Sequence, residues 1–164
     1  MSTVAVGKLA PAFELSGMDG GNHALKDALA RGPVLAAFFK VAFPTCQYAF
    51  PFLERLYRQF HANGVQFWGI AQDSAASAQR FAKEFGVTFP ILIDEEPYET
   101  SREYRLKFVP ALFLIAPDGK VQISGDGFSK RDLLQVQKYF ARYLSVSPPP
   151  LFQAGESVPE YKPG

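Results

Sequence analysis

The chain has very little cysteine, since Cys46 is the only one among 164 residues. One cysteine cannot form an internal disulfide, so no disulfide framework holds this fold, and this suits a reducing compartment. We therefore expect a cytoplasmic protein. Metal-ligand spacing is also lacking, because His23 and His61 have no second ligand at a recognisable interval. We expect both histidines to be ordinary surface residues, and we expect no metal and no cofactor.

An excess of charge of one sign is lacking as well, since 17 basic residues are balanced by 16 acidic ones. Without a strong positive field, or a basic cluster interleaved with aromatic residues, nucleic acid is not an expected partner. Long hydrophobic runs are missing both at the N-terminus and within the chain. We expect a soluble protein that is neither exported nor associated with a membrane.

What the chain does contain is a set of short, continuously apolar segments. They are residues 34–39, 65–71, 90–93 and 111–115. Continuous apolarity predicts strands that are covered on both faces of a sheet. Between them, apolar residues recur at helical spacing, as at Phe52, Leu56 and Phe60. Strands that alternate with helices predict an α/β fold with parallel crossover units.

The segment after the fourth strand predicts a hairpin and a last helix. Pro-Asp-Gly at 117–119 is a turn signal, so the short run 121–124 is expected to pair antiparallel with the strand before it. Ser129, with Asp132 three residues later, resembles a capping box, and apolar residues follow at helical spacing. We expect this helix to pack on the sheet.

Proline dominates the end of the chain. Residues 147–164 are too rich in proline for a helix or a central strand, so we divide the chain into one domain over 1–146 and a Pro-rich tail. Two states of the tail are open. It is either a mobile terminus, or it docks on the body or on a neighbour through Leu151, Phe152 and Tyr161.

The stretch AFPTCQYAF places Cys46 after a buried strand and a short loop, at the start of an amphipathic helix. Backbone N–H groups at a helix start stabilise a thiolate and lower the thiol pKa, which favours a reactive cysteine. The alternative is an inert thiol, because free cysteine is among the most buried residue types.

From Gly7 to Leu144 the chain resembles the thioredoxin-fold redoxins, which comprise the alkyl hydroperoxide reductase/thiol-specific antioxidant (AhpC/TSA) family and its thiol-disulfide oxidoreductase relatives. The segments that carry the resemblance are APAFELSGMDG, FFKVAFPTCQYAFPFLERL, FWGIAQDS and FPILIDEEPYETSREYRLKFVPALFLIAPDGKV. It implies a thioredoxin-like fold, with a central mixed sheet flanked by helices and an N-terminal extension. It also implies that Val109 and Pro110 form the cis-proline corner that faces the redox loop and borders a substrate groove. The alternative is that Pro110 merely begins an edge strand.

Dithiol members of this group carry Cys-x-x-Cys where this chain has Phe43, Pro44, Thr45 and Cys46. The resemblance implies that Cys46 matches the second, deeper cysteine, which resolves a mixed disulfide. Phenylalanine replaces the first cysteine, which is normally the exposed attacking thiolate.

Other helper groups of the family are missing too. Peroxidase members have a threonine at the position of Phe43 and an arginine at that of Pro110. The buried acid of many dithiol members has no counterpart in the first long strand, where Ala36 and Ala37 are found. The scaffold therefore resembles that of a redox protein, with reduced chemistry.

Two functions follow. In the first, the protein is an oxidoreductase of the antioxidant or thiol-disulfide type, in which Cys46 reacts and an external thiol or disulfide partner, of thioredoxin, glutathione or protein type, recycles it. In the second, it is a redox-inactive binding or scaffold protein that keeps the groove at Val109 and Pro110. We favour the first, because a cis-proline corner with a helix-start cysteine is what the chemistry needs.

Overall fold

The computed structural model describes residues 3–61 and 64–164 and has a central mixed sheet with strand order β5-β4-β3-β6-β7. Its strands are β3 (Val34–Phe39), β4 (Gln66–Ala71), β5 (Ile91–Ile93), β6 (Ala111–Ile115) and β7 (Val121–Asp126). β3, β4 and β5 are parallel, whereas β6 is antiparallel to both β3 and β7. The predicted strands, crossovers and closing hairpin are therefore confirmed.

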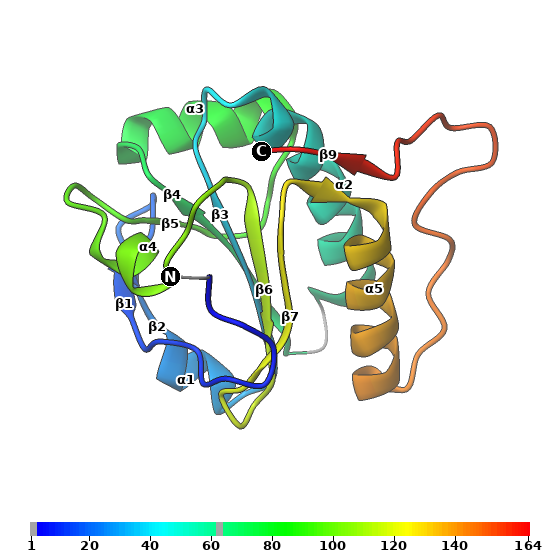
Figure 1. Ribbon diagram of the computed structural model, residues 1–164, viewed down its shortest axis with the longest axis horizontal. Helices are drawn as coiled ribbons and strands as arrows, with labels where there is room; N and C mark the ends of the chain where they lie inside the picture. The colour runs from blue at the N-terminus through cyan, green and yellow to red at the C-terminus, as the bar shows by residue number, and fades with distance from the viewer. Residues whose placement is uncertain (1–2, 62–63) are drawn as a thin grey trace.

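Helices cover both faces of this sheet (Figure 1). The first face carries α2 (Pro44–Phe60), α3 (Ala75–Phe85) and α5 (Lys130–Leu144); the second carries α1 (Leu25–Leu29), α4 (Glu99–Glu103) and the hairpin of β1 (Glu14–Ser16) and β2 (Asn22–Ala24). Neighbouring side chains of β3 point to opposite faces of the sheet and contact the elements on each face. The Phe39 ring packs on Phe50 of α2 and Phe81 of α3, while the Phe38 ring packs on Tyr104 on the other side.

Aromatic packing fills the core between the layers. All six residues of β3 are buried, and Trp68 is only 1 % exposed, as a core position requires. Gly69 lies where the rings of Phe39 and Phe50 approach the sheet, and a Cβ there would lie 3.1 Å from Phe50. A glycine at this position lets α2 pack closely on the sheet.

Two helix starts have side-chain caps and one does not. The Ser129 hydroxyl accepts the Asp132 N–H and caps α5, as the capping pattern predicts, and Ser74 caps α3 by accepting the Ser77 N–H. By contrast, α2 begins after Phe43 without a side-chain cap, and Pro44 occupies its first turn. The helix that carries Cys46 thus begins two residues before the cysteine.

The Pro-rich segment 147–164 docks on the body of the protein (Figure 1, orange to red). Leu151 is buried, and Phe152 packs on Phe52 of α2 with 5.5 Å between ring centroids. Further on, β9 (Tyr161–Lys162) pairs antiparallel with β8 (Phe128–Ser129). Of the two states considered for the tail, the docked one is therefore observed. The division of the chain into a domain over 1–146 and a tail stays a prediction.

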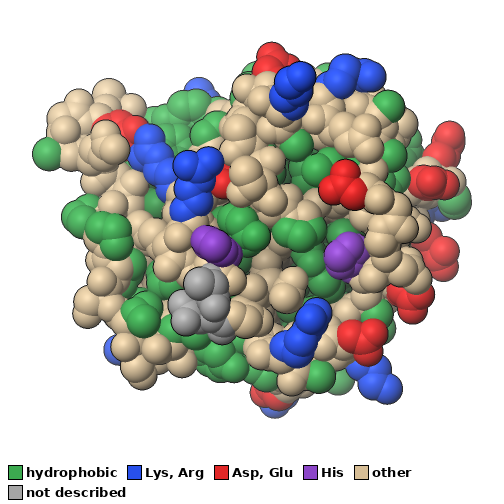
Figure 2. Space-filling view, turned by 180° about the vertical axis from the view of Figure 1, so that it is seen from behind, with side chains coloured by type: hydrophobic (Ala, Val, Ile, Leu, Met, Phe, Trp, Pro, Cys, Tyr) green, Lys and Arg blue, Asp and Glu red, His purple; other side chains and the backbone are tan. Residues whose placement is uncertain are grey.

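The surface is mixed in character. Figure 2 shows basic side chains scattered over the face opposite to that of Figure 1, rather than gathered in one patch. Within the described ranges, 3–61 and 64–164, no helix is long and apolar enough to cross a membrane.

Candidate functional site

Cys46 is the third residue of α2, and its side chain is completely buried. It follows the loop Lys40–Phe43, which leaves the end of β3. The sequence predicted a thiol near the N-terminus of the helix, and this location is confirmed. Of the two environments left open for the cysteine, the buried one is observed.

The pKa of Cys46 is raised in spite of its position at the helix start. Burial raises the pKa of the Cys46 thiol to about 11, a backbone hydrogen bond at Lys40 lowers it in part, and the negative charge of Asp73 raises it further. Desolvation prevails because a thiolate in an apolar setting loses more hydration than the helix terminus restores. At pH 7 only about one Cys46 in ten thousand is a thiolate.

Hydrogen bonds hold the loop in front of the thiol. The Val41 N–H donates to Asp73 Oδ2 at 3.0 Å, and Gln47 Nε2 donates to the Val41 carbonyl oxygen at 2.9 Å. The Phe43 N–H donates to the Lys40 carbonyl oxygen at 3.2 Å. Asp73 thus both fixes the loop and disfavours the thiolate. Sequence reasoning gave Asp73 no role, and its only signal was the Asp-Ser pair that follows the second strand.

Phe43 lies in front of the helix, where a dithiol protein has its exposed cysteine. Its side chain is 40 % exposed, and the Lys40 ammonium lies 5.5 Å from its ring centroid. The same ammonium lies 6.0 Å from the ring of Tyr98. Lys40 is therefore engaged with two aromatic faces beside the loop.

The cis-proline corner is confirmed. The Val109–Pro110 peptide bond is cis, and both residues are buried. The alternative of an edge strand is wrong, because β6 lies between β3 and β7. Phe43 from the loop and Val109 from the corner line one groove of about 240 Å³. The tertiary structure thus brings together the two parts of the predicted site.

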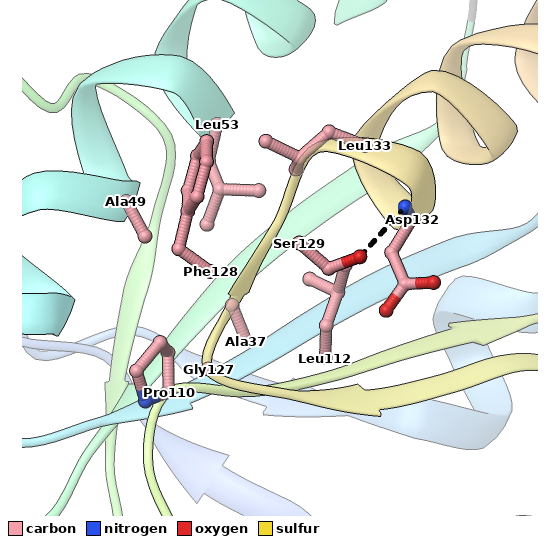
Figure 3. Close-up of a pocket in the computed structure, with 10 residues that line it drawn as sticks. All are labelled: Ala37, Ala49, Leu53, Pro110, Leu112, Gly127, Phe128, Ser129, Asp132 and Leu133. Carbon is pink, nitrogen blue, oxygen red and sulfur yellow. Dashed lines mark hydrogen bonds between the residues drawn. The ribbon is translucent and has the colours of Figure 1, made fainter. Parts of the chain in front are cut away.

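A small apolar cavity lies behind Pro110, between the sheet, α2 and α5 (Figure 3). Ala37 forms part of one wall, where the buried acid of dithiol relatives is missing. Asp132 reaches the opposite wall from α5, and burial raises the pKa of its carboxyl group. Sequence reasoning assigned Asp132 only to helix capping. Cys46 is not among the ten residues that line this cavity, so Asp132 does not replace the missing acid next to the thiol.

Within residues 3–61 and 64–164, no group of three or more histidine, cysteine or acidic side chains is arranged to hold an ion. The groups that the structure gathers at this site are one thiol, the cis-proline corner and the charged groups around them.

The five-stranded mixed sheet, the loop before α2 and the facing cis-proline together define a thioredoxin-like protein. A sequence profile of the AhpC/TSA family matches residues 6–124. The chain belongs to the AhpC/TSA family.

Relatives and solved structures agree with this assignment. The thiol-disulfide oxidoreductase ResA of Geobacillus thermodenitrificans is 33 % identical over 137 residues, which are 82 % of this chain and 77 % of the relative. ResA of Bacillus subtilis is 29 % identical over 120 residues, 73 % of this chain and 66 % of that protein.

Among solved structures, a putative thiol:disulfide interchange protein DsbE from Chlorobium tepidum has a TM-score of 0.73 at 27 % identity, covering 85 % of this chain and 99 % of its own. The peroxidoxin BcpB of Mycobacterium tuberculosis has a TM-score of 0.70 at 21 % identity, over 85 % of this chain and 97 % of its own, and this likeness concerns the fold alone. The thioredoxin-like fold is therefore shared with both oxidoreductase and peroxidoxin structures.

Proposed function

We propose that this chain is a thiol-based redox protein, of the thiol-disulfide oxidoreductase or antioxidant type, which acts through Cys46 with an external thiol or disulfide partner. The observation that carries the proposal is the position of the chain's one thiol, in the first turn of α2, directly after the loop that shares a groove with Val109. Family membership and the name of the Geobacillus relative support the same chemistry. A cytoplasmic location belongs to the proposal, because a lone thiol suits a reducing compartment.

The chemistry is an exchange in two steps. The Cys46 thiolate attacks one sulfur of a partner disulfide, so that a mixed disulfide forms and the other partner sulfur leaves as a thiolate that takes up a proton. An external thiolate then attacks the partner sulfur of the mixed disulfide and releases Cys46. The net result is thiol–disulfide exchange: one partner sulfur is now a thiol, the other is in a disulfide with the external thiol, and Cys46 is again a thiolate. Because the chain has no second cysteine, the second step depends on that external thiol.

Burial sets the rate of this exchange. Cys46 is fully buried behind a loop that Asp73 and Gln47 hold by hydrogen bonds to Val41. A disulfide reaches the sulfur only when the loop opens, and such local opening costs less than unfolding the whole domain. We therefore expect slow turnover that is limited by the loop.

Peroxidase activity is expected to be weak. A peroxidase stabilises the departing oxygen with preorganised polar groups, and Phe43 and Pro110 occupy the places of the family's threonine and arginine. Mild hydrogen peroxide should therefore convert Cys46 to the sulfenic acid slowly, as mass spectrometry after trapping would show. Oxidation as fast as that of an efficient peroxidase would contradict this part of the proposal.

A second candidate is a peptide-binding protein without turnover. It is favoured by the phenylalanine at the exposed position of the loop and by the pKa of Cys46, which burial raises to about 11. In this case Cys46 is a packing residue, and the groove beside Val109 is the functional part.

The two candidates differ in how Cys46 reacts with oxidised glutathione. The native protein is incubated with this disulfide at increasing guanidinium concentrations below the unfolding transition, and the mixed disulfide is measured by intact mass. We expect a rate that depends only weakly on guanidinium at first, because local opening exposes little surface. The adduct should be removed by reduced glutathione, and Cys46→Ser should form no adduct.

The alternative result is that the rate of mixed-disulfide formation increases with guanidinium concentration, from zero denaturant onward, as steeply as the population of unfolded protein does. Cys46 would then react only in the unfolded chain. That result would reject the redox proposal and leave the peptide-binding candidate.

A further inference from the structure

The segment 147–164 is attached at two separate places. The first is an anchor over residues 149–156. The Pro149 carbonyl oxygen accepts hydrogen bonds from the Gln59 and Gln137 side chains, Leu151 is buried, and Arg55 binds both carboxylate oxygens of Glu156, at 2.8 and 2.6 Å. Arg55 also donates to the Leu151 carbonyl oxygen at 3.2 Å. The second place is the stretch 160–164, which lies across the start of α2 (Figure 1).

This second stretch contacts three parts of the candidate site. β9 pairs with β8, and the Lys130 N–H donates to the Glu160 carbonyl oxygen at 3.0 Å. The Thr45 hydroxyl, next to Cys46, donates to the Pro163 carbonyl oxygen at 2.7 Å. Gly164 lies so close to the Val109 carbonyl oxygen that a Cβ on this glycine would collide with it. The chain's own backbone thus borders the groove at the cis-proline corner, and Gly164 forms part of its wall.

Side chains of this stretch meet matching groups on the body. The Tyr161 hydroxyl lies 3.0 Å from Asp126 Oδ1, and the Lys162 ammonium lies 5.0 Å from the centroid of the Tyr48 ring. Strand pairing uses backbone groups and does not select particular side chains. The phenol on a carboxylate and the cation over an aromatic ring, by contrast, favour Tyr and Lys at these two positions.

We propose that β8, the first turn of α2 and Val109 form a binding surface for an extended Tyr-Lys-Pro segment, and that residues 160–164 are its resident, intramolecular ligand. A protein partner of Cys46 then reaches the groove by displacing them with an extended segment of the same chemistry; this last step rests on the redox function proposed above.

The two attachments make such displacement feasible. Tyr161 is 51 % exposed, and the contacts of the second stretch lie at the surface, where single polar pairs contribute little. The anchor at Leu151 and Glu156 is held by Arg55 and meets the second stretch at Lys130, whose ammonium lies 5.3 Å from the Phe152 ring and 3.9 Å from Glu160. Because the Arg55 contacts do not involve residues 160–164, these residues can leave without detaching the whole tail. While anchored, the stretch is present at an effective concentration on the order of 1 mM. A free peptide of the same sequence therefore competes poorly with it.

The test uses the full chain with the ligand stretch altered. In Tyr161→Ala/Lys162→Ala the surface stays intact, whereas the resident stretch loses both preferred contacts. The probe is a fluorescein-labelled peptide with the sequence of residues 158–164, VPEYKPG, measured by fluorescence anisotropy. We expect it to bind this variant at least about tenfold more tightly than the wild-type protein, in which the stretch competes. Ser157→Ala, an exposed change between the two attachments, is the matched control and should behave as wild type.

A second set of variants addresses the surface itself. Adding Thr45→Val and Asp126→Asn to the double variant should abolish the gain in peptide affinity. Hydrogen exchange should show faster exchange at residues 128–130 in Tyr161→Ala/Lys162→Ala than in the Ser157→Ala control, independently of the peptide.

Three results would overturn the inference. They are equal peptide affinity for the wild type and the tail variant, a gain that survives Thr45→Val and Asp126→Asn, and a wild-type protein that dimerises by exchanging tails in sedimentation. All measurements are repeated with Cys46→Ser, so that the outcome for the surface is separate from the outcome for the redox proposal.

Discussion

The two ends of the segment 43–46, Phe43 and Cys46, differ in both chemistry and exposure. Phe43 is 40 % exposed and lines the groove beside the cis-proline corner, whereas Cys46 is fully buried. In a dithiol protein the exposed position attacks and the deep one resolves. Here the sulfur remains only at the deep position. The comparison teaches that spacing and a helix start do not by themselves lower the pKa of a thiol, because burial outweighs both.

The largest expected effect is on the alkylation of Cys46. Since its pKa is raised from 9.0 to about 11, the native thiol should react with iodoacetamide at pH 8 at least about a hundredfold more slowly than in the unfolded chain. The native rate should still increase with pH above 9. Mass spectrometry of timed samples, with the guanidinium-unfolded protein as the reference, measures both rates. Comparable rates would mean that the two loop positions do not differ as described.

The next prediction tests whether position 43 would act as the first cysteine of a dithiol pair if a thiol were restored there. In Phe43→Cys the two cysteines flank Pro44 and Thr45, and such a loop can bring their Cβ atoms to roughly 4 Å, as a disulfide requires. We expect an internal disulfide on oxidation and insulin reduction with dithiothreitol at least about tenfold faster than wild type, because the new thiolate attacks and Cys46 resolves.

Phe43→Ser is the matched control, since it exposes the loop without adding a thiol and should remain slow. If folded Phe43→Cys kept two free thiols under oxidising conditions, the loop would not have dithiol geometry.

The third prediction concerns pH and stability. The folded Cys46 pKa lies above its unfolded value, so the unfolded chain loses this proton first. The neutral Cys46 thiol therefore contributes to the free energy of unfolding in full below pH 9, and this contribution is lost as pH rises through about 11. Wild type should therefore lose about 2 kcal/mol more free energy of unfolding than Cys46→Ala between pH 8 and pH 11. Guanidinium unfolding at both pH values measures this difference, and equal losses in the two proteins would argue against the raised pKa.

The smallest effect lies at the tail anchor, far from the thiol. Hydrogen bonds from Arg55 lower the pKa of Glu156 from 4.5 to about 2. The pair therefore stabilises the fold above pH 4.5, and this contribution is lost as pH falls through about 2. At pH 7, Glu156→Gln should speed hydrogen exchange at residues 151–156 by about twofold to fivefold.

Glu160→Gln serves as the control for this anchor, because Glu160 is 84 % exposed and lies 3.9 Å from the Lys130 ammonium. Hydrogen exchange at residues 151–156 of the Glu160→Gln variant should match that of the wild type. Equal acceleration in both variants would show that loss of negative charge, rather than the Arg55 contact, explains the effect.

The strands and the main helices were predictable because each depends on a local pattern, whereas the cis-proline corner was predictable only through the resemblance to the thioredoxin-fold redoxins. Residues 34–39 are continuously apolar, and Ser129 with Asp132 is a capping signal read within four residues. The environment of Cys46 was not predictable, because its burial and the charge of Asp73 come from a different strand end. Asp132 was read only as a capping residue, since its place on the cavity depends on how α5 packs on the sheet.

The sequence by itself determined the thioredoxin-like α/β fold, the single thiol and the phenylalanine where dithiol relatives have cysteine, since these depend on residue type and order along the chain. Only the tertiary structure decided that Cys46 is buried with a raised pKa, and that residues 160–164 dock beside Thr45 and Val109. The physical reason is that desolvation and strand pairing arise between segments separated by 27 to 118 positions, which no local pattern encodes.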